Sequence, residues 1–308
     1  MRNMKRDCPG GFTLVELLVV LAILGIMIAT TLPALQASRE MARRSQCSHN
    51  LQRILAGIEG YENSQAYYPP GVTDPAAGPI QNRPQGMHQG WILRVLPYLD
   101  ERVAFGKIDF KASVYDAKNA EIARLSLPEL LCPADADLRP HSSYAACHND
   151  LEAPIAVDNQ GVFFLNSIIR ASDITDGLAY TLFVAEKRSE PDEAELGWMS
   201  GTRATLRNTG TQPNCTDAEP PTYSGPPMKP DWKGETGPLP PQQRKLSITA
   251  TSLTYAGGFG SNHADGLMNA ALGDGSVRVI ADTIDSQLYQ HLGNRADGQL
   301  IDLSGLSR

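Results

Sequence analysis

Glu16 is an acidic residue at the edge of a long apolar stretch, where a carboxylate requires a positively charged partner. No charged residue occurs from Leu17 to Gln36, a length that spans the roughly 30 Å hydrocarbon core of a bilayer as a helix. A carboxylate inside a membrane helix costs about 2.5–3.5 kcal/mol on insertion scales, so Glu16 requires a partner. Cleavage between Gly11 and Phe12 would create an α-amino group four residues away, and this ammonium would offset much of the burial cost of both charges.

The cysteines are a second set of residues with potential chemistry. Cys8 precedes this cleavage point, and Cys47, Cys132, Cys147 and Cys215 follow it. The chain after the cleavage point thus has four cysteines, and an even number is typical of a domain exported to an oxidising compartment. Four cysteines allow three pairings; Cys132 and Cys147 close the shortest loop and are the preferred disulfide, with Cys47 and Cys215 as the remainder and free thiols as the alternative. No pair has Cys-x-x-Cys spacing, so neither a zinc ribbon nor a thioredoxin-type site is indicated.

A histidine and several carboxylates are the candidates for catalysis. His263 with Asp265 and Asp274 could supply a general base or a metal site, with Asp176 and Glu186 as further members. The chain has no nucleophile elbow, no His-x-x-x-His pair and no glycine-rich phosphate loop. Because Asp-Gly at a hairpin tip usually serves the turn, we expect structural roles here, with no catalytic residue, no metal and no cofactor.

One long helix is expected to position Glu16. Beyond the apolar stretch, hydrophobic residues recur at three- and four-residue spacing, which is typical of a half-buried helix: Leu51, Ile54, Leu55, Ile58 and Tyr61. The run Tyr68-Pro69-Pro70-Gly71 ends this pattern. The sequence therefore predicts a single helix from Phe12 to about Ser64.

The rest of the chain predicts short elements joined by loops. Short helices are expected at 91–99 and 121–131, with a closing helix at 284–292. Strands are expected at 142–147, 161–165, 181–186 and 251–256, and a β-hairpin that turns at 273–275. Residues 207–243 contain nine prolines, which predicts a long surface loop.

Length and charge limit the class of protein. The 308 residues leave enough chain after the helix for one large domain. The formal net charge is −7, and because residues 1–11 carry +2, their removal would leave −9. Such a chain repels phosphate groups, so we do not expect nucleic acid as a partner.

The residues around the cleavage point resemble a known leader. The run from Gly11 to Glu16, Gly-Phe-Thr-Leu-Val-Glu, follows the basic Lys5 and Arg6 and is similar to the leader of type IV prepilins and type II secretion pseudopilins. The resemblance implies that a prepilin peptidase cuts after the glycine, that Phe12 becomes N-methylated, and that the glutamate guides docking into a filament. It also implies that the chain after the span lies outside the cytoplasm, an orientation that the flanking charges leave open.

Two other interpretations of the N-terminus are a secretory signal peptide and a plain signal anchor. A signal peptide has a shorter apolar core, and small residues near 34–37 could provide its cleavage site. The signal-peptide interpretation leaves Glu16 without a purpose. Determination of the mature N-terminus distinguishes them from cleavage after Gly11.

Several stretches together resemble one large bacterial domain family of unknown function that carries a prepilin leader. They are Arg43-Arg44-x-x-Cys47-x-x-Asn50-Leu51, Tyr68-Pro69-Pro70-Gly71, Leu96-Pro97-Tyr98-Leu99, Leu131-Cys132-Pro133, Asp173-Ile174-Thr175-Asp176-Gly177 with Glu186, and the tail from His263 to Asp274-Gly275-Ser276-Val277. Two departures exist: ten residues, not the usual nine, separate His263 from Asp274, and the family's Asp-Gly-x-Ser-Asn-Thr lacks its Ser and Asn here. The second departure puts a chemical role for that motif in doubt.

Together these features predict an α+β, pilin-like fold in which a long N-terminal membrane-spanning helix packs on an antiparallel β-sheet with long loop insertions. The expected parts are a leader at 1–11, a transmembrane part at 12–36, the soluble half of the helix at 37–66 and an exported domain at 67–308.

The expected protein is a pilin-like or pseudopilin-like structural subunit, not an enzyme. It would sit in the bacterial cytoplasmic membrane as a single-pass protein, with its C-terminal domain in the periplasm or at the cell surface. Its partners would be the prepilin peptidase/methyltransferase, the membrane and other subunits that dock through the N-terminal helix. The alternatives are an anchored binding domain that does not polymerise and, less favoured, a surface enzyme that uses His263 and Asp274.

Overall fold

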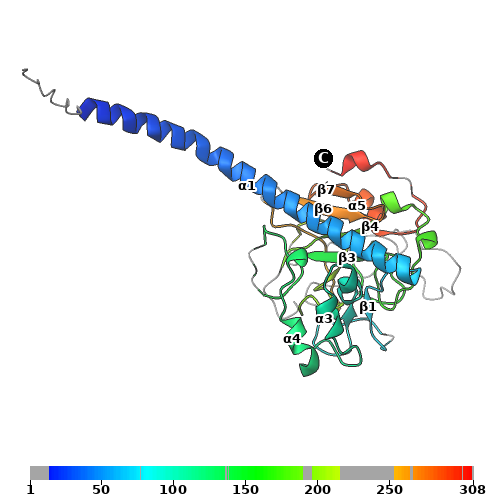
Figure 1. Cartoon of the computed structure of the whole chain (residues 1–308). Coiled ribbons are helices and arrows are strands. Elements are labelled where there is room, and N and C mark those ends of the chain that lie inside the picture. The colour runs from blue at the N-terminus through cyan, green and yellow to red at the C-terminus, as the bar shows by residue number, and fades with distance from the viewer. Residues whose placement is uncertain are drawn as a thin grey trace, which may run out of the picture. The chain divides into compact units, whose positions relative to one another are not determined.

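The computed structural model describes residues 14–76, 78–135, 137, 139–189, 196–215, 253–263, 266–299 and 301–306. The described residues fall into two compact units that divide between Ala42 and Arg43. This division lies inside the first helix, α1, which runs from Leu14 to Gln65 (Figure 1). The long helix predicted from the sequence is therefore confirmed, and it ends at Gln65, next to the predicted end near Ser64.

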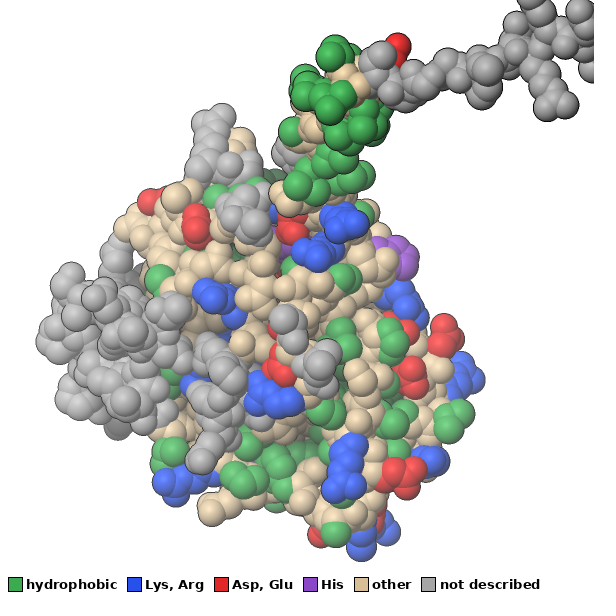
Figure 2. Space-filling view, turned by 90° about the vertical axis from the view of Figure 1, so that its left-hand side faces the viewer, with side chains coloured by type: hydrophobic (Ala, Val, Ile, Leu, Met, Phe, Trp, Pro, Cys, Tyr) green, Lys and Arg blue, Asp and Glu red, His purple; other side chains and the backbone are tan. Residues whose placement is uncertain are grey.

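The N-terminal part of α1 exposes its apolar side chains. Large hydrophobic residues from Leu14 to Leu35 are each 44–79% exposed, and Figure 2 shows this concentration of hydrophobic side chains on the helix. By length and composition this helix can cross a membrane. An apolar surface of this extent is unfavourable in water, so lipid or other apolar helices must cover it.

Two threonine side chains of this segment make hydrogen bonds within the helix. The Thr30 hydroxyl donates to the Ile26 carbonyl at 3.1 Å, and the Thr31 hydroxyl donates to the Met27 carbonyl at 2.9 Å. Hydroxyl groups that bond to the preceding turn do not require water. Both threonines are thus compatible with an apolar environment.

The part of α1 from residue 43 onward has one buried side. Its buried residues reproduce the predicted stripe: Cys47, Leu51, Ile54, Leu55 and Ile58. Two glycines let a neighbouring segment approach closely, since a Cβ at Gly57 would lie 2.9 Å from Leu99 and one at Gly60 would lie 2.8 Å from Tyr98. This side of the helix forms part of the main hydrophobic core.

Within the described ranges, the main sheet has five strands in the order β5-β3-β4-β6-β7. Its members are β3 (Tyr144–Asn149), β4 (Leu182–Glu186), β5 (Leu206–Asn208), β6 (Leu267–Leu272) and β7 (Val277–Ala281). All neighbouring strands are antiparallel except β3 and β5, which are parallel. The predicted antiparallel sheet is therefore mixed at one edge. A separate two-stranded pair joins β1 (Val72–Thr73) to β2 (Gln89–Gly90).

The predicted C-terminal hairpin and helix are confirmed. Strands β6 and β7 pair from Leu267↔Ala281 to Ala271↔Val277, and Gly275 in the turn between them has φ +85°, a conformation that favours glycine. Helix α5 (Ser286–Gly293) is preceded by the N-cap residue Asp285, whose side chain accepts from two backbone N–H groups of the first turn.

Short helices connect the strands. The predicted helix at 91–99 is α2 (Trp91–Val95) followed by η1 (Leu96–Tyr98), and the expected helix at 121–131 is limited to α4 (Ala120–Ala123) and the turn η3 (Pro128–Leu130). The further helices and turns of the described residues are α3 (Arg102–Gly106), η2 (Ala117–Asn119), η4 (Ala171–Asp173), η5 (Leu178–Tyr180) and η7 (Leu303–Gly305).

Two predicted strands are wrong within the part of the chain that the structure describes. Residues 161–165 are buried but irregular, and only Leu165 makes an isolated bridge, to Val72. A Cβ at Gly71 would lie 2.3 Å from the Phe163 carbonyl oxygen, so this segment packs against another backbone. Its apolar composition reflects burial rather than strand pairing. Residues 253–256 form a turn and coil, whereas 251–252 lie outside the described residues, as do 216–243 of the expected loop. The expected loop begins too early, because Arg207 and Asn208 belong to the buried strand β5.

The sheet is covered on both faces. Along β3, Tyr144 and Ala146 belong to the core cluster that includes α1, whereas Ala145 and Cys147 belong to a second cluster that includes Tyr289 of α5. This alternation follows from the two-residue period of a strand. Side chains one residue apart on β3 therefore lie in different cores.

We expect truncation of Ile54 to destabilise the domain. Ile54 is fully buried on α1, so Ile54→Ala should lower the free energy of unfolding by about 2–5 kcal/mol. Chemical denaturation of the full chain in detergent would measure this change. Gln52→Ala, at an exposed position on the same helix, is the matched control and should stay within about 0.5 kcal/mol of the unmodified protein. Equal effects of the two changes would contradict the assigned burial.

Candidate functional site

The processing signal lies at the start of the described chain. Gly11 and Phe12 lie outside the described residues, so their predicted roles stay predictions. Glu16 is exposed in the first turn of α1. A carboxylate is favourable at this end of a helix because the helix dipole places partial positive charge there.

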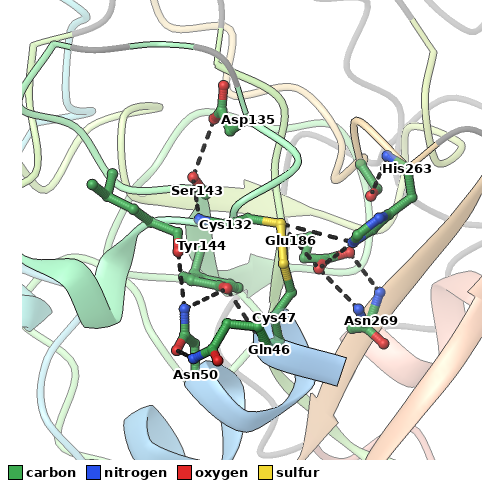
Figure 3. Close-up of a disulfide and its surroundings, with 12 residues drawn as sticks. Gln46, Cys47, Asn50, Cys132, Asp135, Ser143, Tyr144, Glu186, His263 and Asn269 are labelled. Carbon is green, nitrogen blue, oxygen red and sulfur yellow. Dashed lines mark hydrogen bonds and ion pairs between the residues drawn. A yellow bond between two sulfur atoms is a disulfide. The ribbon is translucent and has the colours of Figure 1, made fainter. Parts of the chain in front are cut away.

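The disulfide joins Cys47 to Cys132, with a Cα–Cα distance of 5.2 Å (Figure 3). The predicted Cys132–Cys147 disulfide is therefore wrong, and Cys215 is an exposed free thiol rather than a partner of Cys47. Loop length alone favoured the wrong pair. Cys147 points to the opposite face of the sheet, where its thiol donates to the Asn149 carbonyl at 3.6 Å.

This disulfide fastens α1 to the segment that follows η3. It closes a separation of 85 residues, which corresponds to about 4–5 kcal/mol in the chain-entropy account of disulfide stabilisation. One turn further along α1, the Asn50 side chain donates to the Leu131 carbonyl at 2.9 Å and to the Tyr144 hydroxyl at 3.2 Å. Covalent and hydrogen-bonded contacts thus hold the same part of the helix.

A buried histidine and glutamate lie beside the disulfide. The His263 Nε2 atom is 3.4 Å from Glu186 Oε1, and the two side chains are 0% and 2% exposed. The same Nε2 atom lies 3.7 Å from the Cys132 sulfur. Asn269 orients the carboxylate by donating its backbone N–H to Oε2 at 2.8 Å and its side-chain amide to Oε1 at 2.9 Å.

The structure separates the other candidates from this pair. Asp274 is exposed in the β6–β7 turn, where it accepts from the backbone and hydroxyl of Ser276. Asp176 accepts from the backbone N–H groups of Asp297 and Gly298 at 2.7 and 2.8 Å, and Asp265 lies outside the described residues. The expectation that Asp274 serves its turn agrees with this geometry, and the alternative that pairs His263 with Asp274 in a catalytic site has no geometric support.

A second histidine–carboxylate pair lies next to the disulfide and was missed by sequence reasoning. His141 Nε2 is 2.9 Å from Asp135 Oδ2, and both side chains are buried. Asp135 also accepts from the hydroxyls of Ser143 and Ser189, and Ser143 in turn accepts from the Cys132 N–H at 3.1 Å. No sequence spacing pointed to this network, because its members are joined only by the fold.

The environment shifts both pKa values of this pair. Burial alone would raise the pKa of Asp135, but hydrogen bonds from His141, Ser189 and the backbone of Asp137 outweigh it and lower the pKa to about 2. Burial alone would lower the pKa of His141, yet its bonds to Asp135 and to the Arg139 carbonyl raise that pKa above its ordinary value. The charged forms of both groups are therefore favoured in the folded state.

A cavity of about 620 Å³ opens elsewhere in the same unit. Its lining combines aromatic and polar side chains, among them Tyr61, Tyr67, Tyr98, Arg94 and Asn166. The Tyr61 ring makes edge contacts with those of Tyr67 and Tyr98 at centroid distances of 5.9 and 6.3 Å. Such a combination can bind a ligand that has both apolar and hydrogen-bonding groups.

We expect the Asp135–His141 pair to contribute most to protein stability between about pH 4 and 6.5. The contribution of Asp135, whose pKa is depressed, is present above its unfolded value near 3.9 and is lost as the pH falls toward 2. The contribution of His141, whose pKa is raised, is present below the unfolded value near 6.5 and is lost as the pH rises through the folded pKa. Thermal unfolding at a series of pH values would measure both limits.

The histidine part of this prediction can be isolated by substitution. His141→Asn keeps a hydrogen-bond donor but does not titrate, so the loss of stability above pH 6.5 should become smaller. His49→Asn, at an exposed position of α1, should leave the profile unchanged. An unaltered alkaline limit in His141→Asn would contradict the assignment.

Comparison with known proteins identifies two matching families. The family described as a protein of unknown function (DUF1559) matches residues 36–287, and the prokaryotic N-terminal methylation motif matches residues 8–32. The methylation motif thus covers the predicted cleavage point and Glu16. No solved structure matches the chain.

Curated relatives include type II secretion system core protein G of two bacteria. The Klebsiella pneumoniae protein is 31% identical over 93 residues, which cover 28% of this chain and 64% of the relative. The Pseudomonas aeruginosa protein is 32% identical over 66 residues, which cover 21% of this chain and 46% of the relative. The chain thus spans about half to two thirds of the length of these relatives. Because the first family matches most of its length, the chain belongs to the DUF1559 family, and its N-terminus carries the prokaryotic methylation motif.

Proposed function

We propose that this protein is a pilin-like structural subunit of a type IV pilus-like filament or a type II secretion pseudopilus. A prepilin peptidase cleaves it after Gly11, Phe12 is N-methylated, and the N-terminal part of α1 holds it in the cytoplasmic membrane before assembly. The domain that begins near residue 43 lies in the periplasm or at the cell surface. The observation that carries the proposal is the exposed apolar helix whose first turn contains Glu16.

The apolar surface of α1 supports both stages of this proposal. Lipid covers the exposed side chains while the subunit is stored, and the corresponding helices of other subunits cover them in the filament. Neither stage exposes the apolar surface to water. The helix can therefore move from one environment to the other without a large hydrophobic penalty.

Glu16 gives the assembly its specificity. Apolar helices in lipid gain little from association by hydrophobicity alone, whereas a carboxylate in an apolar environment strongly favours a site that offers a cation. The methylated amino group of Phe12 on a neighbouring subunit provides this cation. Pairing of the two charges fixes the axial position of one helix against the next.

The similarity to type II secretion system core protein G supports the same class of function. Those relatives are named as core proteins of a secretion system. The methylation motif matched at 8–32 agrees with a subunit that is processed before assembly. The family that matches residues 36–287 has no described function, so it supports only the classification of the remaining chain.

We expect Glu16→Ala to leave cleavage intact and to impair assembly. The change leaves the Phe12 ammonium of a neighbour without its partner, at a cost on the order of 2.5–3.5 kcal/mol, or roughly a hundredfold in the docking equilibrium. Mass spectrometry of the N-terminus would show normal processing, and the amount of protein in sheared filaments would fall. Glu40→Ala, which removes a carboxylate beyond the apolar stretch, is the control and should assemble normally. Normal incorporation of Glu16→Ala into filaments would refute this role.

A bulky residue at the cleavage point should have the opposite effect. Gly11→Leu should block the peptidase because the side chain would occupy the space in which the glycine backbone is held. The protein would then keep residues 1–11, which a mass measurement detects directly. A mature N-terminus at Phe12 in this variant would refute the requirement for glycine, and one near residue 37 in the unmodified protein would exclude cleavage after Gly11.

A second candidate function is that of an anchored binding domain that is processed but does not polymerise. The cavity of about 620 Å³ favours it, because the cavity combines three tyrosines with an arginine. Shear fractionation separates the two candidates. A processed protein that remains entirely with the membrane, and that cross-links to no copy of itself through the apolar helix, would support the binding domain.

A further inference from the structure

Four side chains that can bind a metal meet at the disulfide. They are Cys47 of α1, Cys132 after η3, Glu186 at the end of β4 and His263 in the segment before β6, and their ligand atoms all lie within 4.8 Å of one another (Figure 3). All four residues are buried. They come from four separate parts of the chain, so no sequence spacing could have predicted the group.

Three of the distances between these atoms are close to those of a tetrahedral zinc site. Zinc bonds of about 2.0–2.3 Å place neighbouring ligand atoms roughly 3.3–3.8 Å apart. The Cys132 sulfur is 3.9 Å from Glu186 Oε1 and 3.7 Å from His263 Nε2, and these two atoms are 3.4 Å apart. Three of the six edges of the tetrahedron therefore have about the right length, and the bonded pair of sulfur atoms is a fourth edge that must lengthen. The two edges from the Cys47 sulfur to Glu186 and His263 are no longer than 4.8 Å.

We propose that Cys47, Cys132, Glu186 and His263 form a zinc site when the two cysteines are reduced, so that this position holds either a disulfide or a metal ion. The two states exclude each other because both use the same sulfur atoms. The proposal does not depend on filament assembly. It concerns only how α1 is held to the rest of its unit.

The surrounding contacts orient the ligands as outer partners do in metal sites. Asn269 holds both oxygen atoms of the Glu186 carboxylate, and the His263 backbone N–H donates to the Ser261 hydroxyl at 3.1 Å. Ser143 accepts from the backbone N–H of Cys132 at 3.1 Å. Ligating groups that are fixed in this way bind metal more tightly because the side chains lose little conformational freedom on binding.

A disulfide by itself does not account for its neighbours. A neutral disulfide needs neither a carboxylate nor an imidazole beside it, and burial of such a pair carries a desolvation cost that often exceeds the Coulombic gain. A zinc ion uses both groups as ligands, and its charge balances the thiolates. The zinc-bound state therefore gives each of the four side chains a role.

The exchange between the two states balances in atoms and electrons. A dithiol reductant gives two electrons and two protons to the Cys47–Cys132 bond, which breaks to two thiols while the reductant becomes a disulfide. Zinc then displaces one proton from each thiol and binds both thiolates. In the reverse direction, a disulfide oxidant removes two electrons, the sulfur atoms bond again and the zinc ion is released.

The test compares the full chain, purified in detergent, in its two redox states. One sample is reduced without oxygen by a phosphine and desalted, the other is kept oxidised, and both are incubated with zinc and desalted again. Elemental analysis should find about one zinc per reduced chain and essentially none per oxidised chain. Cobalt in place of zinc should produce a sulfur-to-metal charge-transfer band in the reduced sample only. Absence of bound metal in a reduced sample that keeps its circular dichroism would overturn the proposal.

Variants identify the ligands. Competition with a chromogenic chelator should show that Cys47→Ser and His263→Ala each weaken zinc binding by more than the roughly 10–100-fold that loss of an outer partner costs. Glu186→Gln should weaken it as well, with the cobalt–sulfur band preserved. Cys215→Ser removes the exposed free cysteine, and His291→Ala removes a histidine that pairs with Asp297 at 2.7 Å. Both controls should bind zinc normally, and equal binding by Cys47→Ser would overturn the assignment.

Discussion

The attachment of α1 to its own domain is the interaction on which the rest of the structure depends. Residues from Cys47 to Ile58 supply one side of the main core, and the disulfide to Cys132 and the Asn50 hydrogen bonds hold that side in place. The same helix continues from the apolar segment that begins at Leu14. The two parts of this helix therefore have different surroundings. One part packs one side against the protein core, and the other exposes apolar side chains all around, so the two parts need different sequences.

Because both faces of the sheet are buried, several polar side chains also lie in the interior of the protein. The main core contains apolar residues around Trp91 and Phe163, whereas His263, Glu186, His141 and Asp135 lie near its edge, beside the disulfide. Each of these charged or titratable groups has a hydrogen-bonding partner, as burial requires. Specific partners of this kind favour one arrangement of the surrounding loops, which are long and contain few regular elements.

The sequence predicted those features that depend on local patterns. The helix at 14–65 followed from apolar spacing and from the proline pair that ends it, and the hairpin followed from the glycines around Asp274. Predictions failed where several parts of the chain meet. Residues 161–165 have the composition of a strand but form no regular ladder, because they contact both the backbone of β3 and that of Gly71. The pairing of Cys132 depended on which face of β3 carries Cys147. The sequence singled out His263 and Glu186 as candidates, but nothing in it placed them beside Cys47.

The position of the disulfide has a mechanical consequence. A pulling force applied at the N-terminal end of α1 would reach Cys47 before it reached the buried Leu51, Ile54 or Ile58. Peeling of the helix from its domain would therefore stop at a covalent bond, and tension would pass through Cys132 into the segment that leads to β3. The hydrophobic contacts beyond this point would bear little of the load. A protein built in this way resists extraction by force more strongly than its non-covalent packing alone would allow.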